Sequence, residues 1–275
     1  MTYFTPYEAA PSLFHIYEPG DVHCTLIVGR ERALLFDTGY GFCDIREAVS
    51  ALTDLPLTIV NSHGHLDHAG GNFWFDQKIY IHPYERQVYD LYQKEKESLM
   101  DRMWSLYQQG KKPRPWPEGF DLQDYYAYKP CSFIDLTDGQ IFDLGGRIVE
   151  VFFFPGHTRG CVALYDHQSG LLLSGDNLGH SIWIMFEQSA PLAEYRSCLC
   201  RLKVSFDIKG ILGSHYGGIY PASLIDTVIQ CIDQRHDGNS TIFTHPRKGY
   251  KALRRKVPLT GVPGIKDLYL VYPFD

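Results

Sequence analysis

The densest group of chemically active side chains in the sequence is the stretch NSHGHLDHAGGN, residues 61–72. It places His63, His65, Asp67 and His68 within six residues, between an apolar run and two glycines. Imidazole and carboxylate groups at this density are poor material for a core, but they are good ligands for a divalent cation such as zinc. His63 and His65 can approach a metal from one side, whereas Asp67 and His68 are aimed at a neighbouring point. The spacing therefore suggests two adjacent ions.

Two ions need more ligands than this loop supplies, because a catalytic zinc site takes about three protein ligands and keeps a position for water. The later sequence offers one candidate at the end of each of three apolar runs: His157 in FPGHTRG, Asp176 in LLLSGDN and His215 in ILGSHYG. Taken in this order, each close to glycine at a predicted strand end, they favour a metal site over three unrelated surface residues. The remaining histidines lie in no matching motif, and we expect ordinary structural roles for them.

The elements that must position these residues are short strands, each followed by a loop. Strands are predicted at 23–29, 33–39 and 57–61, and a helix is expected from Asp44, as its capping residue, to Leu52. The histidine cluster then leaves the C-terminal end of a strand, where a rigid sheet fixes the origin of a ligand loop.

The later half repeats this plan of strand, loop and helix. Its strands are predicted at 147–156, 161–166 and 171–176, and its helices at 191–204 and 221–235.

Residues 83–130 interrupt the plan. A helix is predicted from Pro83 to Gly110, and a loop rich in proline and aromatic residues follows. The segment is either a surface insertion or oligomer contact, through which a homo-oligomer could form, or a lid over the metal cluster. As a lid it would present an aromatic wall of Trp104, Tyr107, Trp116, Phe120, Tyr125, Tyr126 and Tyr128.

The motifs HGHLDH, GHT and SGD, followed by a last strand-end histidine, resemble the metallo-β-lactamase superfamily. FDTG at 36–39 resembles the early aspartate motif of that family, and the likeness runs from about Val22 to Gly217. It implies an α/β fold, a four-layer αββα sandwich of the metallo-β-lactamase type. We expect a single domain over 1–275, with the insertion at about 83–130 and a C-terminal extension from about 239.

The resemblance also implies a ligand set. One ion would be held by His63, His65 and His157, and the other by Asp67, His68 and His215, with Asp176 bridging the two. Zinc is favoured, and manganese or iron would suit the same donors.

The same resemblance assigns roles around the ions. Two ions bridged by Asp176 and a water would lower the pKa of that water toward about 7 and yield a metal-bound hydroxide. Asp67 could orient this nucleophile or take its proton, and Asp37 would help to hold a ligand and its loop. Tyr216 could donate a hydrogen bond to a substrate oxygen.

These features predict a metal-dependent hydrolase of the glyoxalase II or lactonase-like branch, which has aspartate at the position of Asp176. Its substrate would be a small ester, thioester or lactone. A phosphodiesterase of the same fold is an alternative, because the basic residues Lys251, Arg254, Arg255 and Lys256 could attract an anion. A mononuclear iron sulfur-dioxygenase and a noncatalytic metal-binding protein are two further candidates.

Composition narrows the partners. The net charge of −6 and the pI near 6.0 argue against a nucleic-acid partner, which usually meets a basic surface. No apolar run approaches the roughly 20 residues of a membrane-spanning helix, and no export signal is recognised at the start. The seven cysteines form no CxxC pair. We therefore expect a cytoplasmic protein with a small-molecule substrate and no membrane partner.

Overall fold

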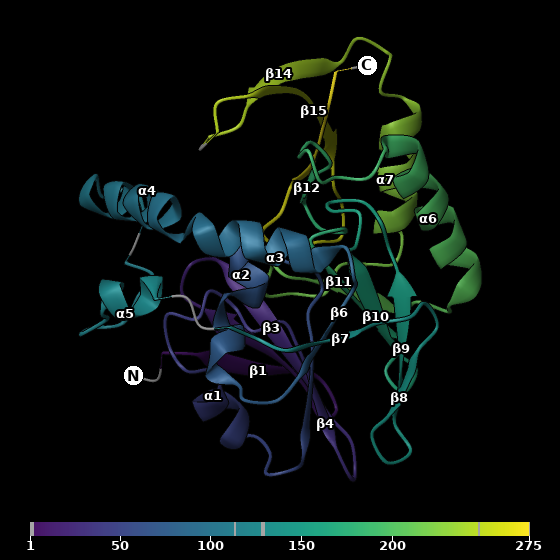
Figure 1. Cartoon of the computed structure of the whole chain (residues 1–275). Coiled ribbons are helices and arrows are strands. Elements are labelled where there is room, and N and C mark those ends of the chain that lie inside the picture. The colour runs from purple at the N-terminus through teal and green to yellow at the C-terminus, as the bar shows by residue number, and fades with distance from the viewer. Residues whose placement is uncertain (1–2, 113, 128–129, 247, 275) are drawn as a thin grey trace. The chain divides into compact units, whose positions relative to one another are not determined.

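The structure is a computed structural model that describes residues 3–112, 114–127, 130–246 and 248–274 (Figure 1). The chain forms two compact units. Unit 1 comprises Met1–Leu136 and Asp143–Arg147, and unit 2 comprises Thr137–Phe142 and Ile148–Asp275. The expectation of a single domain over 1–275 stays a prediction.

Unit 1 is built on a seven-stranded sheet whose strands follow one another in chain order. These strands are β1 (Thr5–Ala10), β2 (Leu13–Glu18), β3 (Val22–Val28), β4 (Ala33–Phe36), β5 (Leu57–Val60), β6 (Ile79–Ile81) and β7 (Phe133–Asp135). The first four pair antiparallel, and β4 to β7 pair in parallel. Strands β3 and β4 form where strands were predicted and are almost wholly buried.

The histidine cluster leaves the C-terminal end of β5, as predicted, and enters the short helix α2 (Leu66–Ala69) and the 3₁₀ helix η1 (Gly70–Trp74). The predicted helix after Asp44 is α1 (Arg46–Ser50). Asp44 lies just before it, where its carboxylate accepts a 3.0 Å hydrogen bond from the Arg46 backbone N–H.

The single helix predicted from Pro83 to Gly110 forms as two: α3 (Glu85–Lys94) and α4 (Lys96–Gln108). The break falls at Glu95, whose backbone leaves the helical region (φ −92°, ψ 2°). This turn places Lys96 inside the unit, where its ammonium donates to the Tyr125 carbonyl oxygen at 3.0 Å and lies 4.5 Å from the centre of the Tyr125 ring. Gly110 follows the end of α4 with φ +66°, as its sequence position predicts.

Part of the predicted aromatic wall is the core of unit 1. Trp116 and Tyr125, which lies on α5 (Leu122–Tyr126), are buried against Tyr40 and Phe42. Trp104 and Tyr107 are exposed. Tyr128 lies outside the described residues. That the segment closes over a substrate stays a prediction.

Unit 2 contains a five-stranded sheet in the order β13-β11-β10-β9-β8 and a four-stranded sheet in the order β12-β16-β15-β14. The first consists of β8 (Ile141–Asp143), β9 (Ile148–Phe153), β10 (Val162–Asp166), β11 (Leu171–Gly175) and β13 (Gly210–Gly213). The second consists of β12 (Ser181–Trp183), β14 (Ser240–Thr244), β15 (Lys251–Pro258) and β16 (Asp267–Tyr272). The extension after residue 239 therefore supplies three strands of a regular sheet.

Two helices, α6 (Leu192–Ser205) and α7 (Leu224–Asp233), bury their apolar faces in the core of unit 2, close to their predicted bounds. Within the described ranges, no helix combines the length and the apolar character that a membrane crossing requires.

A buried carboxylate in β2 gives unit 1 an expected pH dependence. Burial raises the pKa of Glu18 to about 8, against a hydrogen bond from the Tyr40 backbone N–H at 2.7 Å that favours the ionised form. The Tyr3 hydroxyl donates to the Pro115 carbonyl oxygen at 2.5 Å and also faces a Glu18 oxygen at 3.5 Å. As a donor to Glu18 it too favours the ionised form. Burial outweighs these hydrogen bonds, so the folded protein holds the Glu18 proton to a higher pH than an exposed glutamate does.

Because the folded protein keeps this proton over a range in which the unfolded chain has lost it, the free energy of unfolding should fall as pH rises between about 4.5 and 8. The slope contributed by one such group is at most about 1.4 kcal/mol per pH unit. Glu18→Gln should remove most of this pH dependence of the free energy of unfolding, measured by urea unfolding of the metal-free protein. The control Glu118→Gln, at an exposed position, should keep it. An unchanged slope in Glu18→Gln would show that Glu18 is ionised in the folded state.

Candidate metal centre

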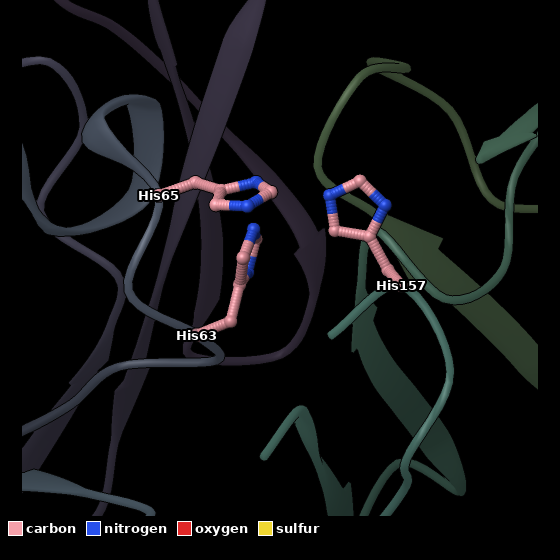
Figure 2. A group of neighbouring side chains, drawn as sticks. All are labelled: His63, His65 and His157. Atoms are coloured by element: carbon pink, nitrogen blue, oxygen red, sulfur yellow. The ribbon is translucent and has the colours of Figure 1, made fainter. Parts of the chain in front are cut away.

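Unit 1 gathers three imidazole rings from the loop after β5. His63, His65 and His68 are 0%, 4% and 0% exposed. The ring centres of His63 and His65 lie 4.5 Å apart, and those of His63 and His68 lie 4.1 Å apart. Figure 2 shows the His63 and His65 rings next to each other at the end of this loop. His65 has an extended backbone and precedes α2, so the turn into the helix brings Asp67 and His68 back beside the two earlier histidines.

Asp37 holds this loop from the end of β4. Its buried carboxylate accepts hydrogen bonds from the Ser62 backbone N–H at 2.6 Å, the Ser62 hydroxyl at 2.7 Å and His68 Nδ1 at 2.9 Å. Burial raises the pKa of Asp37. The charge of His68 and its hydrogen bond oppose this effect but do not cancel it. Because the Asp37 carboxylate accepts the Nδ1–H hydrogen bond, the Nε2 atom of His68 keeps its lone pair for a metal. This Nε2 atom lies 3.6 Å from the Asp67 carboxylate.

Helix α3 supports the same loop, a role that the sequence did not reveal. The buried Glu85 carboxylate accepts a 2.8 Å hydrogen bond from the Gly64 backbone N–H. The Tyr92 ring stacks on the His65 ring with centres 4.1 Å apart. In Figure 1, α3 lies directly along α2. The available signal was Gly64, because a residue without a Cβ between two candidate ligands points to a close approach of backbone.

Gly64→Ala should disturb this support. A Cβ at position 64 would lie 2.5 Å from the Glu85 carbonyl oxygen and 2.5 Å from the Tyr89 backbone nitrogen, so α3 and the ligand loop must move apart. We expect a loss of about 1–3 kcal/mol in the free energy of unfolding and a metal affinity about tenfold lower. Chelator competition and urea unfolding measure both. Gly179→Ala, whose Cβ would meet one atom at an ordinary 3.7 Å, is the control. Unaltered metal affinity in Gly64→Ala would contradict the supporting role of α3.

Unit 2 brings its three candidate ligands together from three strand ends. His157 follows β9, Asp176 follows β11 and His215 follows β13. One Asp176 oxygen lies 3.5 Å from His157 Nε2, and the other lies 3.3 Å from His215 Nε2. Each oxygen thus faces a different imidazole nitrogen. The bridging role of Asp176 stays a prediction.

The orientation of His157, whose ring is drawn in Figure 2, is fixed by its neighbours. Its Nδ1 lies 2.8 Å from the Trp183 carbonyl oxygen, to which it can only donate, so Nε2 is left to face Asp176. The Asn177 side-chain oxygen accepts a 2.7 Å hydrogen bond from the His157 backbone N–H. Sequence reasoning found the candidate ligand and missed these two residues that hold it.

The predicted role of Tyr216 finds no support in its contacts. Its hydroxyl donates to the Pro263 carbonyl oxygen at 2.8 Å. A hydrogen bond from Tyr216 to a substrate stays a prediction that would require this bond to break.

Arg254, Arg255 and Lys256, three of the four basic residues that could attract an anion, contact carboxylates or aromatic rings. Arg255 is buried and makes hydrogen bonds of 2.5 and 2.7 Å to the Asp237 carboxylate. Lys256 lies 2.9 Å from Asp267, and the Arg254 guanidinium lies 5.4 Å from the centre of the Tyr269 ring. These contacts are structural, and they weaken the case for an anion site on this segment.

Comparison with known proteins identifies the family. The family model described as the metallo-beta-lactamase superfamily matches residues 17–217. The chain is 28% identical over 174 residues to the human acyl-coenzyme A thioesterase MBLAC2, a match that covers 58% of this chain and 60% of the human one. It is 30% identical over 122 residues to a hydroxyacylglutathione hydrolase from Synechococcus, with 44% and 34% covered.

A structural comparison tests the fold. The crystal structure of a metallo-beta-lactamase family protein from Thermus thermophilus is similar with a TM-score of 0.59 at 19% identity, covering 86% of this chain and 97% of that one. This likeness confirms the predicted α/β fold of the metallo-β-lactamase type. Such a fold implies divalent metal binding, and the imidazole and carboxylate donors described above suit it. The chain belongs to the metallo-beta-lactamase superfamily.

Proposed function

We propose that this protein is a metal-dependent hydrolase of a small ester, thioester or lactone, with a centre of two divalent metal ions. The observation that carries the proposal is the carboxylate of Asp176, whose two oxygens face two different imidazole nitrogens. A carboxylate that binds one cation through each oxygen would need its imidazole neighbours in this arrangement. Zinc is the favoured ion, because nitrogen donors predominate among the ligands.

The ligands divide into two sets in this proposal. One ion would be bound by His63, His65 and His157, and the other by Asp67, His68, Asp176 and His215. Bound ions of this kind acidify a water molecule and polarise the carbonyl group that is attacked.

The residues of the chain would supply orientation and proton transfer. Asp37 accepts a hydrogen bond from Nδ1 of His68, and the Trp183 carbonyl oxygen accepts one from Nδ1 of His157. The Nε2 atoms of both rings then remain available to bind a metal. Asp67 is 23% exposed at its side chain, so its carboxylate can both orient a water molecule and accept its proton.

A thioester is the favoured substrate among the three bond types. The human relative is named an acyl-coenzyme A thioesterase, and the chain matches it over 60% of that protein's length. A phosphodiester is less favoured, because Arg255 and Lys256 of the extension have carboxylate partners within unit 2.

A turnover screen tests the proposal. Esters, thioesters, lactones and phosphodiesters are offered to the protein as purified, after chelation, and after reloading with zinc, manganese or iron. We expect thioester hydrolysis that chelation abolishes and a divalent ion restores. A fully loaded protein that cleaves none of the four bond types would overturn the proposal, and oxygen consumption with a persulfide would replace it with an oxidative function.

A further inference from the structure

Unit 1 contains a cavity of about 300 Å³ between the turn that joins β2 to β3 and the inner face of α4. Its volume is at the lower end of the range of about 300–1,000 Å³ that small-molecule sites occupy. Its lining includes Tyr40, Leu99, Met103, Leu106, Lys112 and Pro115.

The walls of this cavity suit an apolar chain. Tyr40 and Pro115 are buried at its inner side, and Leu99, Met103 and Leu106 of α4 are half-buried along it. Three charged residues also line it. The Lys112 ammonium lies 3.5 Å from the Asp21 carboxylate, and both side chains are more than half exposed, whereas Arg102 of α4 is half-buried. The apolar side chains of the lining would bind a hydrocarbon chain by the hydrophobic effect.

The cavity also lies next to the ligand loop. Leu99 packs against the cluster of Leu66, Val88 and Tyr92, and Leu66 stands between the candidate ligands His65 and Asp67 in the sequence. Leu99, a wall residue of the cavity, therefore packs against the cluster that contains Leu66, which lies on α2 beside Asp67.

Tyr40 makes a second connection. It follows Gly39, whose backbone pairs with Ala69 and accepts a 3.1 Å hydrogen bond from the Gly71 N–H. The loop that supplies the inner wall of the cavity is thus bonded to the segment that directly follows His68.

We propose that this cavity holds the acyl chain of the substrate, so that the natural substrate is a thioester of a medium-length linear fatty acid. The inference rests on the proposed hydrolase function and names its substrate class. In the reaction the bond between the acyl carbon and the sulfur breaks. Water gives its hydroxyl to the acyl carbon and its remaining proton to the thiolate.

Cavity-filling variants provide the test. Met103→Trp and Leu106→Trp place an indole in the cavity, and Leu91→Trp makes the same change on the exposed face of α3. The substrates are acetyl-, octanoyl- and palmitoyl-coenzyme A. Each buried methylene favours binding by a factor of about four, so kcat/KM of the parent protein should rise strongly from acetyl to octanoyl. Both cavity variants should lose about tenfold or more of the octanoyl value and keep the acetyl value within about twofold, whereas Leu91→Trp should change neither.

Binding of free octanoate, measured by calorimetry, separates this inference from the proposed function. If the fully loaded protein cleaves none of the four bond types, the proposed function fails, and loss of octanoate binding in Met103→Trp still supports an acyl site. An octanoyl-to-acetyl ratio that both cavity variants leave unchanged overturns the inference while hydrolysis stands. The inference is equally overturned if octanoate binds the parent protein but the ratio does not respond, because the cavity is then an effector site.

Discussion

Asp176→Ala is expected to lower the metal content well below two equivalents per chain and to reduce turnover by about a thousandfold or more. The carboxylate faces His157 with one oxygen and His215 with the other, so its removal takes a ligand from both proposed ions. Metal ions contribute several kcal/mol to the stabilisation of a hydrolytic transition state, which corresponds to at least three orders of magnitude in rate. Elemental analysis and steady-state kinetics on the same preparation measure the two losses together.

Asp207→Ala is the matched control, because this aspartate is exposed in unit 2 and pairs with the surface residue Lys209. It should retain full metal content and activity. Retention of two equivalents of metal by Asp176→Ala would refute the bridging role. Full metal content with lost turnover would instead assign Asp176 to the proton transfer alone.

The candidate ligands could be predicted from the sequence because each follows an apolar run that forms a strand. The ends of β9, β11 and β13 carry His157, Asp176 and His215 within one unit, and the spacing of HGHLDH is short enough to be set by a single turn. The position of a residue at the end of a strand and its spacing from neighbouring ligands can both be inferred from the sequence alone.

The supporting residues could not be predicted, because their contacts depend on packing between distant segments. Glu85 reaches a backbone N–H 21 residues earlier, and Trp183 offers a carbonyl oxygen 26 residues after His157. The break at Glu95 is of the same kind: the apolar spacing continues through it, and Lys96 beyond it donates to a carbonyl oxygen 29 residues later. The sequence of the extension likewise shows its basic residues but not the carboxylate partners of Arg255 and Lys256.

Asp37→Asn should lower the affinity for one of the two ions by about ten- to a hundredfold while leaving the fold intact. The backbone at position 37 has φ +67°, which asparagine tolerates well, and the two side chains have the same shape. The control is Asp166→Asn. Asp166 is also buried and also accepts hydrogen bonds from a serine N–H and hydroxyl, those of Ser169, but it lies in β10, outside the ligand motifs.

The reason for the loss is the tautomer of His68. The Ser62 N–H needs an acceptor, so the side-chain oxygen of the introduced asparagine should take that position and its NH₂ group should face His68 Nδ1. Nδ1 must then accept a hydrogen bond, so the single proton of the neutral ring lies on Nε2, the atom that would bind the metal. Competition with a chelator should release one ion from Asp37→Asn at a lower chelator concentration than from Asp166→Asn. If both variants hold two ions equally well, His68 does not bind a metal through Nε2, and the assignment of the second ligand set is wrong.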